Sequence, residues 1–347
     1  MKPFETLSAA DVLAIPPEEP ERLFSGDCDA IRGEFIALVK RWHPDRNAGS
    51  ATAALVFDRV TTLHRAAQCK LAEGRWAAPD SIRIEIAAGG SFLLPVKRRH
   101  AFELGEMAIA RDRVVFLVDD AHAALFEAGL RRIAGIRYPD ARVRRDIAPF
   151  MPEIEGVHTA GDRRVAIITK SDDVVLLADL LRHAGGALPP RHVAWIVSSL
   201  LNLVCFFAVG GLTHNALASD TVFVTPQHHA AYPLGGWWYA ARAGARITAL
   251  PEASYALLPR SMAEAKRADI RLDLECVRAI GRACLGDPTG LTLPARADLP
   301  RPMADFLRLP SSGSAIDDYR DWGATLDDSF GPRRFVELPI SFSDVYP

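Results

Sequence analysis

The tripeptide His43-Pro44-Asp45 combines residue types that can address a partner from the end of a helix. Proline fixes φ and ends a helix. The aspartate carboxylate can accept a charge-assisted hydrogen bond from a partner cation. Basic side chains, which steer an acidic partner and act mostly on association rate, lie near it in the sequence at Arg32, Lys40, Arg41 and Arg46. These residue types favour recognition of an acidic partner.

Two predicted helices position the tripeptide. Apolar residues fall on one face of a helix over residues 29–42, at the spacing of an amphipathic helix, at Ile31, Phe35, Leu38 and Trp42. Ser50 is a predicted N-cap for a second helix over residues 51–74. Its apolar face is expected at Phe57, Val60, His64 and Leu71. Before the tripeptide, a short helix around residues 18–24 is predicted.

Helix, basic flank, His-Pro-Asp turn and second helix together resemble the J-domain of DnaJ-type co-chaperones, over roughly residues 20–75. In that family the turn docks on a DnaK-type chaperone ATPase and stimulates ATP hydrolysis. The resemblance implies that His43, Pro44 and Asp45 are the stimulatory signature. It implies a docking face made of Arg32, Lys40, Arg41 and Arg46. Two alternatives stay open, a plain turn between helices and a degenerate J-domain that stimulates nothing.

Length and composition set limits on the class of protein. A chain of 347 residues predicts two or three domains, and 49% apolar residues allow sizeable cores. A net charge of −2 gives no global attraction to nucleic acid or to an anionic membrane. The richest apolar run, residues 193–209, is interrupted by Asn202 and serines, so we expect no membrane span. No N-terminal signal pattern is seen, and a cytoplasmic location is expected.

Cysteine and histidine spacing predicts no metal site and no bound cofactor. The 5 cysteines form no Cys-x-x-Cys pair, which favours reduced thiols and argues against structural zinc. His228 and His229 are adjacent, and neighbouring residues rarely point at one ion, so a turn pair is the favoured interpretation.

The pattern changes after a predicted linker over residues 77–80. Alternating or buried strand patterns occur at 81–87, 91–96, 106–110, 114–118 and 165–169, with a helix over 121–134. Later segments are mostly helical, at 174–183, 190–209, 272–285 and 303–309. The tail from residue 311 is expected to be ordered only where apolar surface receives Trp322, Phe335 and Val336. The predicted domains are 1–76, 81–173, 174–310 and the tail 311–347.

A strand-rich region followed by a helical one is similar to the order of the protein-kinase fold, over roughly residues 95–310. Residues 165–224 resemble a kinase hinge, two large helices and a catalytic loop. The expected fold class is therefore α+β and multidomain. A small all-α J-domain helical hairpin precedes a bilobal protein-kinase-like fold with an antiparallel β-rich N-lobe and a helical C-lobe.

The resemblance also exposes missing chemistry. Residues 214–221 align with the family motif H-R-D-L-x-x-x-N, in which His214 and Leu217 match. Ala216 occupies the base position and Thr221 the metal-binding asparagine position. The strand lysine position holds Leu117, which leaves Glu127 of the following helix without its partner. The metal-binding triplet should fall at residues 234–236, around Gly235, where no aspartate lies.

Phosphoryl transfer depends on each of these charges. The loss of one costs several kcal/mol of transition-state stabilisation, roughly a hundred-fold in rate. The sequence therefore predicts a pseudokinase-like domain with no catalytic residues, not an enzyme. Asp220 is either a weak metal ligand or a solvated loop residue, and the aromatic triplet at 237–239 is either a binding patch or a core plug.

The predicted function is that of a J-domain co-chaperone or adaptor. Its expected partners are a DnaK-type chaperone ATPase and an unidentified client or assembly, with nucleic acid and membrane not expected. One alternative is a structural component of a large complex, for example a viral one. The other is an atypical kinase-like enzyme that retains nucleotide binding.

Overall fold

The chain divides into two compact units, Met1–Ser81 and Ile82–Pro347. The computed structural model describes residues 7–25, 30–47, 49–73, 76, 80–85 and 91–347. Each unit has a hydrophobic core of its own. Most of the expected linker, residues 77–79, lies outside the described residues, as do the expected helix stop at Gly74 and Cys28.

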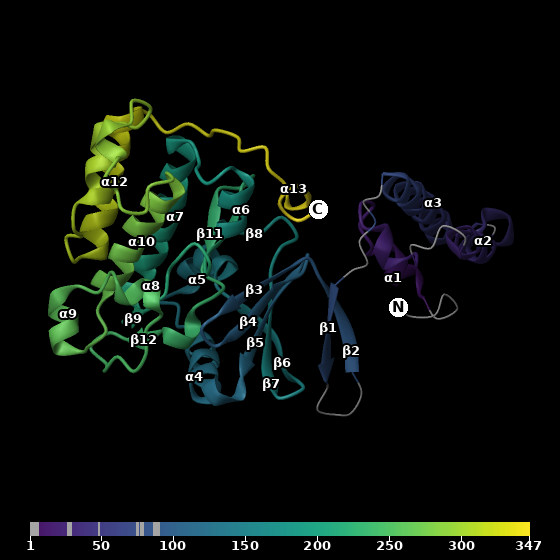
Figure 1. The fold of residues 1–347 in the computed structure, drawn as a ribbon, viewed down its shortest axis with the longest axis horizontal. Helices are drawn as coiled ribbons and strands as arrows, with labels where there is room; N and C mark the ends of the chain where they lie inside the picture. Colours follow the sequence, from purple (N-terminus) through teal and green to yellow (C-terminus); the bar gives the residue numbers. More distant parts are fainter. Residues whose placement is uncertain (1–6, 26–29, 48, 74–75, 77–79, 86–90) are drawn as a thin grey trace. The chain divides into compact units, whose positions relative to one another are not determined.

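The first unit is helical (Figure 1). Its helices are α1 (Ala9–Leu13), α2 (Ala30–Trp42) and α3 (Ala51–Ala72), with single 3-10 turns at Pro20–Arg22 and Pro44–Arg46. The Ser50 hydroxyl caps α3 by accepting a hydrogen bond from the Ala53 amide at 3.2 Å. The two long predicted helices are confirmed. The helix expected over residues 18–24 is wrong, because only one 3-10 turn forms there, and α1 was not predicted.

The hydrophobic core of this unit contains the predicted apolar face of α2. On α3, the buried face differs from the predicted one. Ile31 and Leu38 are buried, and Phe35 and Trp42 pack against them, as expected. On α3 the buried stripe is shifted by about one residue and includes small side chains, namely Ala53, Val56, Val60, Leu63 and Ala67. Two of the predicted core residues, Phe57 and His64, are only half-buried. Large apolar residues dominated the prediction, whereas the buried face also includes the small side chains of Ala53 and Ala67.

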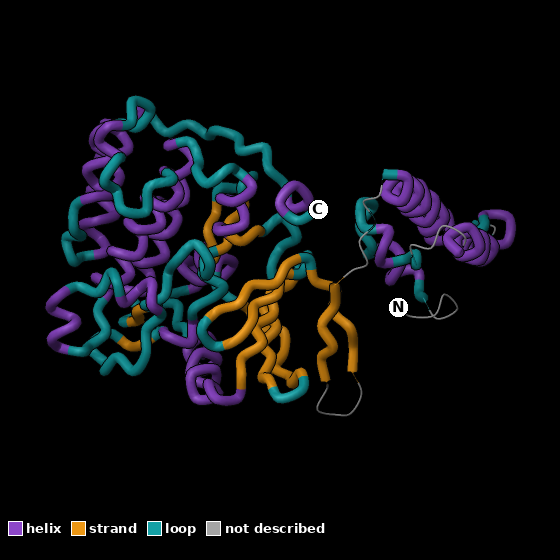
Figure 2. The backbone as a smooth tube through the Cα atoms, in the orientation of Figure 1, coloured by secondary structure: helices purple, strands orange, loops and turns teal. Residues whose placement is uncertain are grey.

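The larger unit begins with a seven-stranded sheet, drawn in orange in Figure 2. The strand order is β2-β1-β6-β7-β5-β4-β3. The pairs β1–β6, β6–β7, β7–β5, β5–β4 and β4–β3 are antiparallel. The bounds are β1 Asp80–Glu85, β2 Ser91–Val96, β3 Arg98–Phe102, β4 Gly105–Ile109, β5 Arg113–Asp119, β6 Glu153–Ala160 and β7 Arg163–Thr169. Strands β3 and β6 were not predicted.

Helices follow the sheet, as expected. The principal ones are α4 (Ala123–Ala134), α5 (Ala141–Ile147), α6 (Leu177–His183), α7 (Pro190–Val209), α10 (Ile270–Cys284), α11 (Arg301–Arg308) and α12 (Ala315–Phe330). Shorter elements are α8 (Glu252–Tyr255), α9 (Arg260–Ala265), α13 (Phe342–Val345), β8 (Val175–Leu176), β9 (Leu212–Thr213), β10 (Phe223–Thr225), β11 (Ala230–Tyr232) and β12 (Ala241–Arg242). Helices α10 and α12 both pack against α7.

The region expected to be a tail is largely structured. Helix α12 has 16 residues, and its Trp322 is buried with the indole N–H donating to the Ser198 hydroxyl at 2.8 Å. Phe335 is 66% exposed, contrary to expectation. The apolar residues that are buried after α12 are Leu338, Phe342, Val345 and Tyr346. The helical region therefore extends beyond residue 310.

Helix α7 is long and apolar enough to cross a membrane by length and composition, which the sequence analysis did not expect. Its mean hydropathy is 2.0, so Asn202 and the serines interrupt it less than anticipated. However, 67% of that window is buried inside the protein. A core helix passes the same test, so the observation is weak evidence for a membrane span.

Candidate functional site

The His43-Pro44-Asp45 turn is held by hydrogen bonds within its own segment. His43 leaves the helix with φ −59° and ψ 134°, and its Nδ1 accepts a hydrogen bond from the Asp45 amide at 3.2 Å. The Asn47 side-chain amide donates to the carbonyls of Arg41 at 2.9 Å and of His43 at 3.1 Å. The Arg41 carbonyl lies at the end of α2, where carbonyls have no partner within the helix. The His43 carbonyl also accepts the backbone amide hydrogens of Arg46 and Asn47. The turn is therefore a defined shape rather than a loose loop.

The polar groups of this turn lie on the surface. The Asp45 side chain is 87% exposed and that of His43 is 41% exposed. The His43 ring also packs edge-on against Phe57, with ring centroids 5.6 Å apart. The other residues of the predicted docking site are all exposed, namely Pro44, Arg32, Lys40, Arg41 and Arg46. A partner can thus reach the carboxylate while Phe57 supports the imidazole.

Polar contacts tie the segment before α2 to helix α3. Lys70 donates to Glu21 at 2.6 Å, and both side chains are mostly buried. The Arg59 guanidinium donates to the Ile15 carbonyl. Partly buried, hydrogen-bonded ion pairs hold geometry better than exposed ones. These contacts fix the elements that support the turn.

In the larger unit, the loop beginning at His214 is anchored from beneath by Asp273. This carboxylate, at the start of α10, accepts the amide hydrogens of His214 at 2.7 Å and of Asn215 at 2.6 Å. Burial raises the pKa of Asp273 to about 7, although the two amide donors lower it. Burial lowers the pKa of His214 to about 3. Asp273 was not among the predicted site residues, and its signal in the sequence was a carboxylate beside apolar residues in the predicted helix.

The side chains at the predicted base and metal-binding positions of this loop, Ala216 and Thr221, line the pocket but offer it no free acceptor group. Ala216 is buried, and the Thr221 hydroxyl donates to the Ala216 carbonyl at 2.6 Å and accepts from the Ala218 amide at 2.9 Å. A Cβ on Gly235 would come within 3.1 Å of the Thr221 Cα, so the two segments are in close contact. The Thr221 hydroxyl therefore serves the loop's own backbone.

Leu117 does not face the pocket that lies beside this loop, which corrects its assignment to the lysine position. Side chains alternate across a strand. Leu117 joins the cluster formed with Ile82 and Ile84, whereas its neighbour Phe116 lines the pocket. Glu127 of α4 pairs with Arg164 of β7 at 2.9 Å. Leu117 and Glu127 are therefore not brought together at the pocket.

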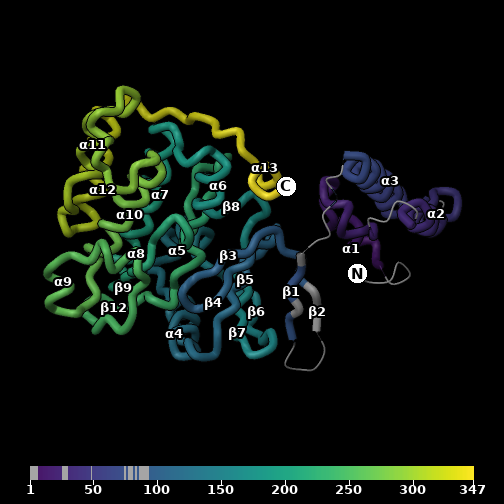
Figure 3. The backbone as a smooth tube through the Cα atoms, viewed as in Figure 1, coloured from purple at the N-terminus to yellow at the C-terminus, as the bar shows by residue number. Residues whose placement is uncertain are grey.

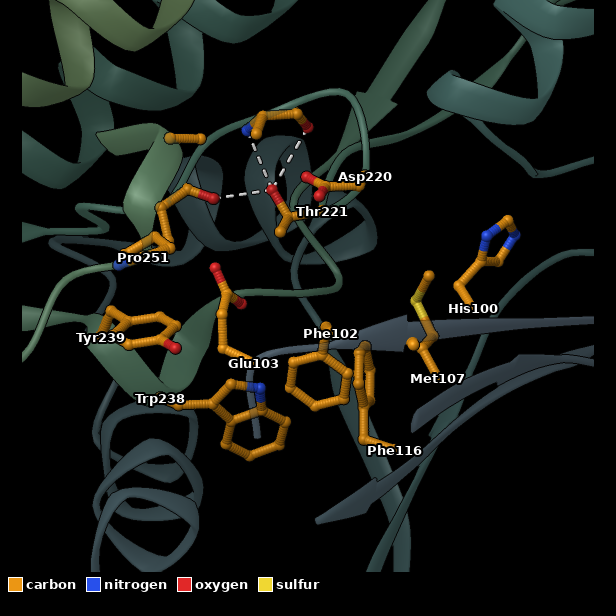
Figure 4. Close-up of a pocket in the computed structure, with 15 residues that line it drawn as sticks. His100, Phe102, Glu103, Met107, Phe116, Asp220, Thr221, Trp238, Tyr239 and Pro251 are labelled. Carbon is orange, nitrogen blue, oxygen red and sulfur yellow. Dashed lines mark hydrogen bonds between the residues drawn. The ribbon is translucent and has the colours of Figure 1, made fainter. Parts of the chain in front are cut away.

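The pocket is small and largely aromatic on one side. Its volume is about 60 Å³, which accommodates a few water molecules, each needing about 10–15 Å³. Rings of Phe102, Phe116 and Trp238 gather on one side, and Asp220 and Thr221 lie on the other (Figure 4). Glu103 starts beside the rings and points towards Thr221. Among the described residues that line it there is no lysine or arginine. Phosphate groups would therefore meet the carboxylates of Glu103 and Asp220, and the lining residue that can carry a positive charge is His100.

Trp238 is part of the hydrophobic core. This favours the interpretation that the aromatic triplet at 237–239 fills the core, rather than forming a patch that binds a partner. It stacks on Phe126 with centroids 5.4 Å apart and meets Phe116 edge-on at the same distance. A Cβ on Gly129 of α4 would lie 2.5 Å from the indole ring, so glycine is required for this approach. Trp237 and Tyr239 are also buried.

The adjacent histidines occupy separate surroundings. His229 is sandwiched between Trp195 at 4.7 Å and Phe335 at 4.3 Å between ring centroids. Nε2 of His228 lies 3.7 Å from Oδ2 of the Asp173 carboxylate. Within the part of the chain that the structure describes, no group of three or more His, Cys, Asp or Glu side chains could hold a metal ion. Asp220 is exposed at the rim of the pocket.

Comparison with known proteins gives no family assignment. No protein-family model matches the chain, and no curated protein matches it. Among solved structures, the chain is similar to a crystal structure of the BubR1 kinase domain, with a TM-score of 0.49 and 10% sequence identity. The similarity covers 71% of this chain and 83% of that one. At this TM-score it carries no conclusion about fold or activity.

Proposed function

We propose that this chain is a cytoplasmic J-domain co-chaperone or adaptor. Its first unit recruits a DnaK-type chaperone and stimulates that chaperone's ATPase. Its larger unit is a catalytically inactive, kinase-like domain that binds a client or an assembly. The observation that carries the proposal is the exposed His43-Pro44-Asp45 turn held between α2 and α3.

The chemistry of the turn supports the first part. The Asp45 carboxylate is 87% exposed and can accept a charge-assisted hydrogen bond from a partner cation. The basic side chains on and after α2 are exposed and attract an acidic surface, which raises the rate of association. Because the turn is fixed by its own hydrogen bonds, little ordering entropy is lost when it docks.

The larger unit supports the second part through the charges it lacks. Phosphoryl transfer needs a base, a cation on the phosphates and metal ligands. Ala216 has no proton acceptor, the Thr221 hydroxyl is used by backbone, and Phe116 takes the pocket-facing place on β5. The antiparallel sheet followed by a helical region suits a kinase-like arrangement without transfer chemistry.

The direct test compares wild type with His43→Gln in steady-state ATP turnover by a DnaK-type chaperone. We expect wild type to raise turnover several-fold and His43→Gln to lose the stimulation. His228→Gln is the matched control, since His228 is exposed and lies in the other unit. Equal rates for wild type and His43→Gln would remove the co-chaperone function.

Thermal melting distinguishes the proposed adaptor function from the alternative of an atypical enzyme that retains nucleotide binding. The adaptor predicts no shift in melting temperature when magnesium and ATP are added, because no lysine or arginine lines the described part of the pocket. A saturable upward shift would support an atypical enzyme that binds nucleotide. Recovery of the chain only within a large particle, with no effect on chaperone turnover, would favour the structural alternative.

A further inference from the structure

The last residues of the chain, 331–347, form a segment that we call the C-terminal strap. Figures 1 and 3 show it leaving α12 as an extended yellow stretch and ending at α13 beside α6. No helix or strand occurs between residues 331 and 341. Its end, by contrast, is anchored, because Phe342, Val345 and Tyr346 are buried.

Tyr346 makes the central contact of this anchor. Its hydroxyl donates to the Asp179 carboxylate at 2.9 Å and accepts the Leu176 amide hydrogen at 3.0 Å. The ring is only 2% exposed, and burial raises the pKa of the phenol. Without Tyr346, a buried amide and a buried carboxylate oxygen would each lose a partner, which is costly in a protein interior.

Asp179 links the strap to the pocket. The same carboxylate oxygen lies 2.9 Å from Nε2 of His100, and the second oxygen accepts from Arg182. His100 lies on β3 and lines the pocket, whereas Asp179 lies on α6. One buried carboxylate thus connects the strap, the helical region and the edge strand of the sheet.

Phe342 adds a second anchor at the segment after β7. The Lys170 ammonium lies 4.6 Å from the centre of its ring, and the Arg111 guanidinium lies 5.9 Å from it. Cations at such distances are attracted by the negative face of an aromatic ring. Residues 331–337 of the strap are mostly exposed, and its buried side chains are confined to its end, at Leu338, Phe342, Val345 and Tyr346.

We propose that the C-terminal strap is a releasable closure. It detaches as a unit while the remainder of the larger unit stays folded, and its docked state holds His100 at the pocket edge through Asp179. Segments with few buried contacts open at lower free energy than the core. On release, the Asp179 carboxylate and the Leu176 amide both lose their hydrogen bonds to Tyr346. The edge of the pocket at His100 then becomes mobile.

Hydrogen exchange of the full-length chain, followed by NMR, tests this device. In wild type we expect the Leu176 amide to exchange at least about ten-fold faster than Cys276 and Val277 in α10. In Tyr346→Phe, which keeps the ring, Leu176 should exchange about ten-fold faster again, with the α10 amides unchanged. Tyr255→Phe is the matched control, because Tyr255 is 70% exposed and lies outside the strap.

Two results would overturn the proposal. If Leu176 and the α10 amides exchange at one common rate in wild type, the strap opens only with global unfolding. If the His100 ring signals stay in place in Tyr346→Phe, the strap does not act on the pocket edge. A shift of those signals, absent from Tyr255→Phe, is the expected outcome.

Discussion

His43 and His214 each begin a polar turn that resembles a family motif, but their surroundings are opposite. His43 and Asp45 are largely exposed. His214 is fully buried, and its nearby aspartate, Asp273, is buried beneath it. The first pair presents polar groups to solvent, whereas the second holds a loop in shape. The comparison shows that motif resemblance alone does not separate recognition from scaffolding, and burial does.

The largest expected effect comes from removing the buried carboxylate. Asp273→Ala leaves the amides of His214 and Asn215 without an acceptor, and should lower the free energy of unfolding of the larger unit by roughly 3–5 kcal/mol. Asp45→Ala is the matched control and should leave the midpoint unchanged. Denaturant unfolding followed by tryptophan fluorescence measures both. A loss below about 1 kcal/mol for Asp273→Ala would show that the loop does not need this anchor.

Two glycine substitutions, one in each unit, are expected to change stability in opposite directions. Gly129→Ala drives a Cβ to 2.5 Å from the Trp238 ring and should destabilise the larger unit by about 1–3 kcal/mol. Gly33→Ala in α2 meets nothing within 4 Å and should stabilise the first unit by about 0.5–1 kcal/mol. Calorimetric melting resolves the two units. If Gly129→Ala leaves the melting temperature of the larger unit unchanged or raises it, the packing around Trp238 is looser than described.

Acidification offers a third comparison. The pKa of His214 is about 3 in the folded chain and about 6.5 when unfolded, so the unfolded state binds the proton first. Its contribution to stability is present above pH ~6.5 and is lost as pH falls toward 3. Asp273, with a raised pKa, acts in the opposite direction. His214→Phe should therefore flatten the acid side of the stability profile, by up to about 1.4 kcal/mol per pH unit.

Unfolding midpoints measured from pH 7 to pH 4 check that sign. His228→Gln serves as the control, because its side chain is 74% exposed. A profile for His214→Phe that is as steep as that of wild type would mean that His214 takes up its proton without cost to the fold.

Periodicity predicted the elements whose faces carry large apolar residues. The helices around His43 and the buried strand at β7 appear within one or two residues of their expected bounds. Strand β6 was missed because it carries few apolar residues, with Gly156 and a register irregularity between Ile154 and Gly156 in its middle. Helix α12 was missed because its many aspartates suggested a solvated tail, although Trp322 is fully buried.

The site positions depended on register, which sequence alone does not provide. Leu117 and Phe116 differ by one residue, and a slip of one residue moves a side chain to the opposite face of a strand. Contacts between distant segments, such as Tyr346 with Asp179 or Gly129 with Trp238, leave no periodic signal. The exposed turn at His43 was accessible to prediction because it is local.

The most direct test of the central claim is ATP turnover by a DnaK-type chaperone in the presence of Asp45→Asn. This change removes the charge of an exposed carboxylate while keeping its shape, and the fold should be unaffected. Asp146→Asn, on exposed α5 of the other unit, is the matched control. We predict that ATP turnover falls to the unstimulated rate with Asp45→Asn and stays at the wild-type rate with Asp146→Asn. Turnover equal to that of wild type would contradict the claim that this surface addresses a chaperone.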